Sequence, residues 1–280
     1  MSMNQVRRLI FSMSITSIGR ILLVRDRVLG RVSWNGRGRS SDTRVSHHSI
    51  SSGACLLDAV LVKPEAVATR ASLLICHGIG ETVQHWLPVQ ELLAANGIAS
   101  LVFDYSGYGE SSGLFDSDQS EDDAVSAFHC LQRLTSPLPV SVLGFSLGSG
   151  IATAVVGKLP AHRLVLCAAF TSLRDAVVSV GIPKAIASVA PPIWEAEGAL
   201  RDCPIDVLVV HGEKDRLFPV RMGRDLASFC GSRSKLVIAQ NVAHNQPFRH
   251  PELSYWGPIA SWLLSGQGSL SRERSPRSLP

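Results

Sequence analysis

Residues 140–148 of the chain read VSVLGFSLG, and this stretch decides the interpretation of the fold. An apolar run that predicts a short buried strand (140–143) leads directly into Gly144-Phe145-Ser146-Leu147-Gly148, and the small and apolar residues that follow predict a helix over 146–159. A G-x-S-x-G sequence between a strand and a helix is typical of a sharp turn that exposes a serine hydroxyl, because glycines relieve the crowding around a strained backbone. We therefore interpret Ser146 as a candidate nucleophile, with an incidental serine in a glycine-rich turn as the alternative.

The same alternation of short apolar runs and helical patterns continues on both sides of this turn. Further strands are predicted at residues 55–62, 72–76, 99–103, 163–168, 207–210 and 235–238, and further helices at 88–96, 118–134, 223–229 and 255–264. Short, continuously apolar strands that alternate with helices predict an α/β fold in which helices cover both faces of a mostly parallel central sheet. We find no internal repeat and no second core, so we expect one domain.

A serine hydroxyl is a weak nucleophile at neutral pH, so a general base is expected downstream of the turn. The candidate is His244, which lies in a polar loop after the last predicted strand, 235–238. Loops that follow strand ends are where catalytic groups concentrate. His250 lies farther along the chain, beside Pro251. The alternative for His244 is an exposed loop histidine without a role in catalysis.

A carboxylate that orients the base is expected between the serine and the histidine in the sequence. Asp215 follows the predicted strand 207–210 closely and is the candidate. A buried carboxylate there would hold the imidazole in one tautomer and stabilise the imidazolium that forms during attack. Glu213 is the nearest rival for this role. The alternative for Asp215 is a turn or a salt bridge, since Lys214 and Arg216 are its neighbours.

Two backbone N–H groups would complete such a site by binding the developing oxyanion. In this kind of turn one N–H comes from the residue after the nucleophile, which is Leu147, and the other from an early loop. The loop at residues 77–80, HGIG, places Ile79 in that position. We expect His77 itself to be structural, because an imidazole at a strand end often bonds to backbone groups of the loop.

Composition argues for a globular protein without a nucleic-acid partner. The chain has 280 residues, 45% of them hydrophobic, and its formal net charge is +4. Its basic residues gather at the two ends: residues 1–44 contain nine Arg and two acids, and residues 265–280 contain three Arg and one acid. The body therefore carries a negative net charge and no basic stripe that would follow a polyanion.

The cysteines and the absence of ligand motifs bear on cofactors and location. Six cysteines are scattered without a C-x-x-C pair or a cysteine–histidine spacing that suits zinc (Cys55, Cys76, Cys130, Cys167, Cys203 and Cys230). No dinucleotide fingerprint occurs, so we expect neither a metal nor an organic cofactor. Buried thiols in a long, core-rich chain favour a reduced compartment, and we expect a cytoplasmic protein.

Three segments are expected along the chain. Residues 1–44 form a basic leader that is predicted to be loosely ordered, residues 45–264 form the folded domain, and residues 265–280 form a disordered tail. The apolar stretch 9–18 in the leader is too short to span a membrane. The Arg-rich, acid-poor leader also resembles a transit peptide or a basic interfacial helix, so organelle targeting and peripheral membrane contact stay open.

Four stretches of the sequence together resemble the α/β-hydrolase superfamily: residues 77–80, 104–111, 144–148 and 211–215. In particular they resemble its small esterases, its lysophospholipase-like members and its serine-aminopeptidase-like members. The resemblance covers about residues 50–264. It implies the fold and a triad of Ser146, Asp215 and His244, and it does not specify the substrate.

Residues 172–203 form an insertion that is expected to act as a lid over the nucleophile. The segment at residues 169–175 resembles the start of the cap in the branch that contains depalmitoylating and lysophospholipid enzymes. Apolar side chains in the insertion would form a pocket for an acyl chain, or they would complete the hydrophobic core.

The expected function is hydrolysis of a carboxylic ester or thioester through an acyl-enzyme intermediate, on a small acyl-ester or lipid-like substrate. An amide or peptide hydrolase of the aminopeptidase type is one alternative, and a non-catalytic binding protein that keeps the fold is the other. The serine in the turn disfavours epoxide hydrolase and dehalogenase chemistry, which use an aspartate there. Acyl chain length and oligomeric state are left open.

Overall fold

The computed structural model describes residues 42–188 and 191–265. The predicted basic leader lies outside the described residues except at its last positions, and so does the predicted tail after residue 265. Thr43 and Arg44, which we had assigned to the leader, belong to the first strand. Within the described ranges, no helix combines the length and the apolar character that crossing a bilayer requires.

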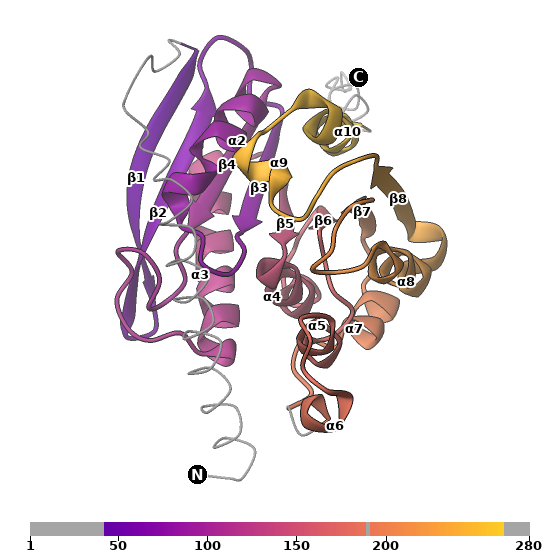
Figure 1. Cartoon of the computed structure of the whole chain (residues 1–280). Coiled ribbons are helices and arrows are strands. Elements are labelled where there is room, and N and C mark those ends of the chain that lie inside the picture. Colours follow the sequence, from indigo (N-terminus) through magenta and orange to yellow (C-terminus); the bar gives the residue numbers. More distant parts are fainter. Residues whose placement is uncertain (1–41, 189–190, 266–280) are drawn as a thin grey trace, which may run out of the picture.

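An eight-stranded sheet organises the described part of the chain (Figure 1). Its strands are β1 (Thr43–Ser52), β2 (Cys55–Pro64), β3 (Ala71–Cys76), β4 (Ile98–Phe103), β5 (Val140–Phe145), β6 (Arg163–Cys167), β7 (Asp206–Gly212) and β8 (Ser234–Ala239). Their spatial order is β1-β2-β4-β3-β5-β6-β7-β8. Pairing is antiparallel between β1 and β2 and between β2 and β4, and parallel from β4 through β8. The prediction of a mostly parallel α/β sheet is confirmed.

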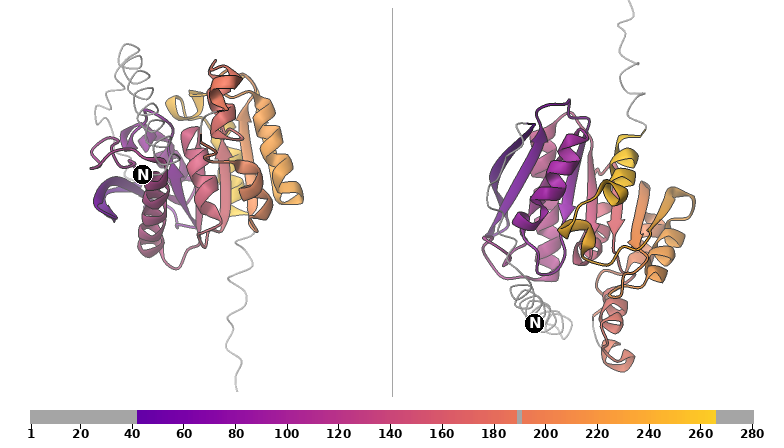
Figure 2. Two further views of the ribbon diagram at one scale, coloured as in Figure 1. Left: turned by 90° about the horizontal axis from the view of Figure 1, so that it is seen from below. Right: turned by 45° about the horizontal axis from the view of Figure 1, so that its top comes forward.

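Helices cover both faces of the sheet (Figure 2). One face packs against α3 (Ser117–Thr135), α4 (Leu147–Val156), α7 (Ala196–Asp202) and α8 (Val220–Cys230), and the other against α2 (Val83–Ala95), α9 (Gln246–Arg249) and α10 (Leu253–Leu264). A 3-10 helix, Gly231–Arg233, follows α8. Strand side chains alternate between the two cores: Leu74 of β3 enters the first, and Leu73 and Ile75 enter the second. Apolar side chains make up both cores, so a polar site is expected at an edge of the sheet.

Two elements at the start of the domain differ from the sequence prediction. The strand β1 was not predicted, because its sequence is polar and it lies at the edge of the sheet, where only Ile50 and Ser52 are buried. Helix α2 begins at Val83 and not at Pro88, which we had taken as its first residue. Thr82 and His85 form a capping box there, since the His85 imidazole bonds to the Thr82 N–H at 3.0 Å. Pro88 therefore lies inside the helix.

The insertion after β6 contains three short helices. They are α5 (Leu173–Ser179), α6 (Lys184–Ala187) and α7. Leu173, Ile193 and Trp194 from this segment are buried in the core on the first face. Figure 1 shows α5 and α6 extending away from the body of the molecule. The core alternative is thus correct for the base of the insertion.

Candidate active site

The serine of the G-x-S-x-G turn sits in a strained backbone conformation between β5 and α4. Ser146 has φ of 53°, in the left-handed region that side chains other than glycine rarely occupy. A Cβ on Gly148 would lie 2.0 Å from the carbonyl oxygen of Cys76, and a Cβ on Gly144 would lie 2.5 Å from that of Gly148. The two glycines are therefore required by close packing, as the motif predicted. The turn presents the hydroxyl at the carboxyl end of the sheet.

Three distant segments bring their side chains together at this edge. The Ser146 hydroxyl donates to His244 Nε2 at 2.9 Å, and His244 Nδ1–H donates to Asp215 Oδ2 at 2.7 Å. The imidazole is held between Phe145 and Phe218, with ring centroids 5.7 Å and 5.1 Å away. Serine, imidazole and carboxylate thus form one hydrogen-bonded chain, which is the arrangement that activates a serine.

Asp215 is buried and well supplied with donors. Its Oδ1 accepts the N–H groups of Leu217 and Phe218, each at 2.9 Å. His211 donates to the Phe218 carbonyl at 2.9 Å and also lies 3.5 Å from Asp215 Oδ2. Burial alone would raise the pKa of Asp215, but hydrogen bonding to His211 and His244 outweighs this effect and holds the pKa well below its usual range. The carboxylate is therefore ionised at neutral pH.

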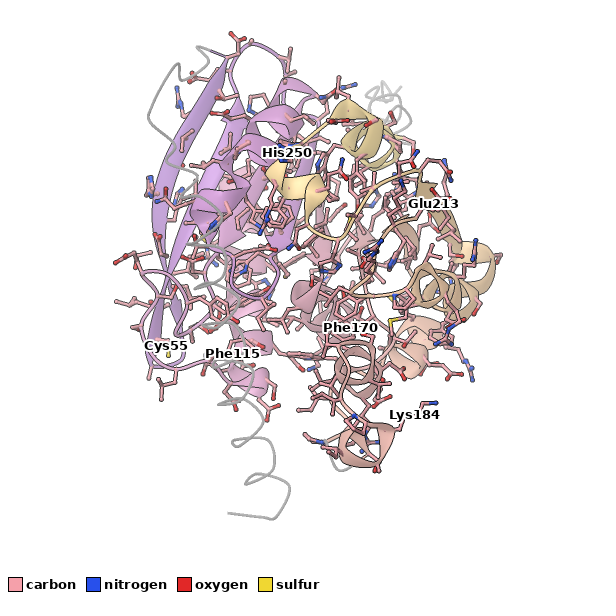
Figure 3. The ribbon with its side chains drawn as sticks, viewed as in Figure 1. Cys55, Phe115, Phe170, Lys184, Glu213 and His250 are labelled. Atoms are coloured by element: carbon pink, nitrogen blue, oxygen red, sulfur yellow. The ribbon has the colours of Figure 1, made fainter. Side chains whose placement is uncertain are left out.

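The rival residues of the sequence prediction lie elsewhere. Glu213 Oε2 accepts the N–H of Asn241 at 3.1 Å, and Figure 3 shows Glu213 toward the outer side of the molecule near β8. His250 lines the cavity in front of the serine, where it makes no hydrogen bond to the hydroxyl. The distances therefore single out Asp215 and His244 as partners of Ser146.

The predicted oxyanion donors lie on two elements that meet at the serine. Leu147 is the first residue of α4, and its N–H is at the positive end of the helix dipole. Ile79 lies in the loop after β3 and lines the same cavity as Ser146. These positions are consistent with an oxyanion hole built from backbone N–H groups.

A buried glutamate, to which the sequence analysis gave no role, supports this loop. Glu81 Oε2 accepts the N–H of Gly78 and the indole N–H of Trp86, both at 2.8 Å, and the residue also lines the cavity. Burial raises the pKa of Glu81, although His77 and the two donors oppose the shift. The sequence feature that could have pointed to Glu81 is its position two residues after Ile79, in a loop that follows a buried strand.

His77 is structural, in keeping with its predicted role, and it belongs to a second polar network behind the loop. Its Nδ1 donates to the carbonyl of Gly78 at 2.9 Å, and its Nε2 lies 3.5 Å from Asp104 Oδ1. The same Asp104 oxygen accepts the N–H of Val83 at 2.9 Å. Asp104 thereby links the loop that carries Ile79 to the start of α2. This network fixes the position of the loop relative to the sheet.

A cavity of about 890 Å³ opens in front of Ser146 and His244. Its lining includes the cationic side chains of Lys214, Arg216 and Arg249. No salt bridge joins Lys214 or Arg216 to another described residue. None of the lining residues comes from the insertion 172–203. The sequence hypothesis that the insertion forms an acyl pocket is therefore not supported by this cavity.

The described residues offer no cluster of metal ligands. Within the described ranges, no three His, Cys, Asp or Glu side chains are grouped as a metal site would need. All six cysteines are described, and each is a free thiol.

Comparisons with known proteins agree with the fold. The family model described as serine aminopeptidase, S33 matches residues 67–198, a little under half of the chain. Human protein ABHD12B is 27% identical over 204 residues, and the zebrafish (Danio rerio) lysophosphatidylserine lipase ABHD12 is 24% identical over 201 residues. The matches cover 63% and 64% of this chain, and 56% and 52% of those relatives. The chain thus spans little more than half the length of the relatives it matches.

Solved structures show the same architecture. The Pyrococcus furiosus esterase Pf2001 superposes with a TM-score of 0.67 at 17% identity, covering 85% of this chain and 99% of that esterase. The sheet order and the likeness to these solved structures show that the chain has the α/β-hydrolase fold. In sequence it is similar to proteins named lysophosphatidylserine lipases and, over residues 67–198, to the serine aminopeptidase, S33 model.

Proposed function

We propose that the chain is a serine hydrolase that cleaves a carboxylic ester or thioester through an acyl-enzyme intermediate. The Ser146 oxygen attacks the acyl carbon while His244 Nε2 accepts its proton, and the carbonyl oxygen becomes an oxyanion. The N–H groups of Leu147 and Ile79 bind that oxyanion. The ester bond then breaks, and the leaving alcohol or thiol takes the proton from the imidazolium. Water repeats the sequence on the acyl group, which leaves as a carboxylic acid.

The observation that carries this proposal is the continuous chain of hydrogen bonds at the edge of the sheet. Ser146 lies 2.9 Å from His244, which lies 2.7 Å from Asp215. A base within hydrogen-bond reach is what makes an ordinary hydroxyl nucleophilic, and an ionised carboxylate keeps the imidazole in the required tautomer. The strained backbone at Ser146 also supports the proposal, because such strain concentrates at functional sites.

A fluorophosphonate probe tests the proposal directly, because it phosphonylates an activated serine and releases fluoride. The wild-type chain should be labelled, and Ser146→Ala and His244→Ala should not. His250→Ala is the matched control, since this histidine lines the same cavity without contacting Ser146. Equal labelling of Ser146→Ala and wild type would show that the nucleophile is another residue. Equal labelling and turnover in His244→Ala would show that this histidine is not the base. A wild-type chain that is neither labelled nor active on esters or amides would leave a binding protein on the hydrolase fold as the better account.

The substrate class is inferred from the cavity and from the relatives. Relatives are named lysophosphatidylserine lipases, and solved structures with this fold are named esterases. The cationic side chains of Lys214, Arg216 and Arg249 at the cavity favour an acyl ester that carries an acidic group near the scissile bond. Hydrolysis rates over an ester series from acetyl to palmitoyl, each with a neutral and an acidic head, would define chain length and charge preference together.

Amide cleavage is the second candidate, because the matching family model is described as serine aminopeptidase. The same acyl-enzyme chemistry would apply, with an amine as the leaving group protonated by His244. Turnover of aminoacyl amides that exceeds turnover of p-nitrophenyl esters would favour this reaction. A cytoplasmic location stays a prediction, and fractionation of cells that express the full chain would test it.

A further inference from the structure

The hairpin of α5 and α6 projects from the edge of the sheet that carries the candidate active site. It follows the carboxyl end of β6, and Ser146 follows the carboxyl end of β5, which pairs in parallel with β6. The views in Figures 1 and 2 agree that the hairpin stands clear of the body. Figure 3 shows Lys184 at the far end of the hairpin and Phe170 near its base. The hairpin therefore reaches beyond the rest of the molecule on this side.

The sequence of this segment is unusual for a protruding surface. Between Asp175 and Glu195 the chain contains no acidic residue, and Lys184 is its sole charged residue. Surface helices ordinarily place charged side chains toward solvent, whereas this segment consists largely of valine, isoleucine, alanine and proline. A short helical tip of this composition is expected to be covered by something apolar.

The structure leaves the apolar side chains at the tip uncovered. All residues of the tip (180–186) are exposed, and the large apolar ones are strongly so: 51% for Val180, 39% for Ile182 and 59% for Ile186. The base of the hairpin is different, because Leu173 and Ala176 are buried. Single exposed apolar residues are common on soluble proteins, but three gathered on one convex tip mark an interaction surface.

We propose that the tip 180–186 inserts into the interfacial region of an anionic lipid bilayer. A stable protein interface engages about 20–30 residues on each side, far more than this narrow tip offers. Insertion into the headgroup region needs only a short apolar face with a basic flank. Lys184 supplies a positive charge that favours anionic headgroups, and no acidic side chain lies on the tip to oppose it.

Insertion at this place would turn the carboxyl edge of the sheet toward the lipid. Ser146 lies at that edge, so an acyl ester held in the bilayer would be on the same side of the molecule as the serine. This consequence rests on the proposed function, but the binding itself does not, because docking requires no catalysis. Vesicle binding and probe labelling can therefore fail independently.

Co-sedimentation of the full chain with vesicles tests the proposal. The vesicles are phosphatidylcholine alone or phosphatidylcholine mixed with phosphatidylserine. The double variant Ile182→Glu/Ile186→Glu should lower the partition coefficient on both by about 100-fold, because two apolar contacts are lost and two charges are added. Lys184→Gln should lower it about fivefold on the mixed vesicles and leave it unchanged on neutral ones. Leu253→Glu is the matched control, since Leu253 is 61% exposed but lies on α10, away from the hairpin.

Two further measurements separate docking from misfolding and from self-association. If the double variant unfolds at the same temperature as wild type and is labelled equally by the fluorophosphonate probe, its fold is intact. Ile186→Trp should bind vesicles at least as tightly as wild type, because tryptophan favours the membrane interface. Unchanged partitioning of a folded double variant would overturn the proposal. So would a wild-type dimer in sedimentation velocity that the double variant dissociates without a change in vesicle binding, because the tip would then face a second copy of the chain.

Discussion

Two buried carboxylates flank the candidate nucleophile, and their surroundings push their pKa values in opposite directions. Asp215 follows β7 on one side of Ser146, and Glu81 follows β3 on the other. Both are nearly inaccessible to solvent. The pKa of Asp215 is held below its usual range, whereas the pKa of Glu81 is raised. Burial acts on both, so the difference must come from the donors around each group.

The donor geometry explains the difference. Both oxygens of Asp215 are satisfied, Oδ1 by two backbone N–H groups and Oδ2 by His244. On Glu81, the N–H of Gly78 and the indole of Trp86 both bond to Oε2 alone. A carboxylate with full hydrogen bonding is kept ionised, and one with partial hydrogen bonding yields to desolvation. The ionised Asp215 thus lies against the His244 imidazole, whereas Glu81 bonds to the loop that carries Ile79.

The largest effect is expected from removing the charge on the Asp215 side. Asp215→Asn should lower kcat/KM for a p-nitrophenyl ester by about 10⁴-fold, because an amide at this place favours the wrong tautomer of His244. Glu213→Gln is the matched control and should change kcat/KM little, since Glu213 bonds to Asn241 and not to the imidazole. A loss in the control as large as that in Asp215→Asn would make Glu213 the orienting acid.

The opposite pKa shifts predict opposite effects of pH on stability. The depressed pKa of Asp215 stabilises the fold above the usual aspartate pKa, and this contribution is lost as the pH falls. The raised pKa of Glu81 favours the fold below the usual glutamate pKa, and this contribution is lost as the pH rises. As the pH rises from 3 to 7, Asp215→Asn should therefore become more destabilising relative to wild type. Over the same range Glu81→Gln should become less destabilising. Each change should amount to about 1–3 kcal/mol in the free energy of unfolding measured with urea. If the destabilisation changed with pH in the same direction in both variants, the opposite pKa shifts of Asp215 and Glu81 would be contradicted.

Much of this site could be predicted from the sequence because its residues follow strands with apolar sequences. The apolar runs fix where each parallel strand ends, and those ends meet at one edge of the sheet. Ser146, Asp215 and His244 each follow such an end, so their proximity follows from the order of the strands. Their function as a triad is a prediction that the labelling experiment tests.

The residues that the prediction missed depend on contacts that periodicity does not report. The role of Glu81 depends on the Trp86 indole, which comes from the next helix. Strand β1 carries few apolar residues, because an edge strand is stabilised by backbone pairing with β2 rather than by burial. The apolar residues of the insertion follow no pattern that separates core from surface: Leu173 is buried and Ile186 is exposed. Which of these apolar residues are buried and which are exposed depends on the three-dimensional packing.

A moderate effect is expected when the Glu81 side is weakened. Glu81→Ala should lower kcat about tenfold, because a shift of the loop away from Ile79 forfeits part of the 10²–10³-fold contribution of one oxyanion donor. Glu81→Gln keeps an oxygen that accepts from Gly78 and Trp86, so it should recover most of the activity. KM for a neutral ester should change little in both variants, as expected for a positioning residue. Glu110→Gln is a suitable control, because Glu110 is exposed and does not line the cavity. Equal losses in the Ala and Gln variants would show that the charge matters, which would contradict the positioning role.

The smallest effect is expected at the cavity edge, where the two sides differ in charge. Lys214 and Arg216 flank Asp215 and line the cavity, and the loop with Glu81 carries no cation. Arg216→Gln should raise KM for an ester with an acidic head about threefold, and leave KM for its neutral analogue unchanged, because an exposed charge contributes less than about 1 kcal/mol. Added salt should erase the difference, since exposed charges are screened. Arg221→Gln is the control, as Arg221 pairs with Asp225 on α8 and does not line the cavity. If Arg216→Gln raised KM equally for both esters, the side chain would act by shape, and the charge preference proposed for the substrate would lose its support.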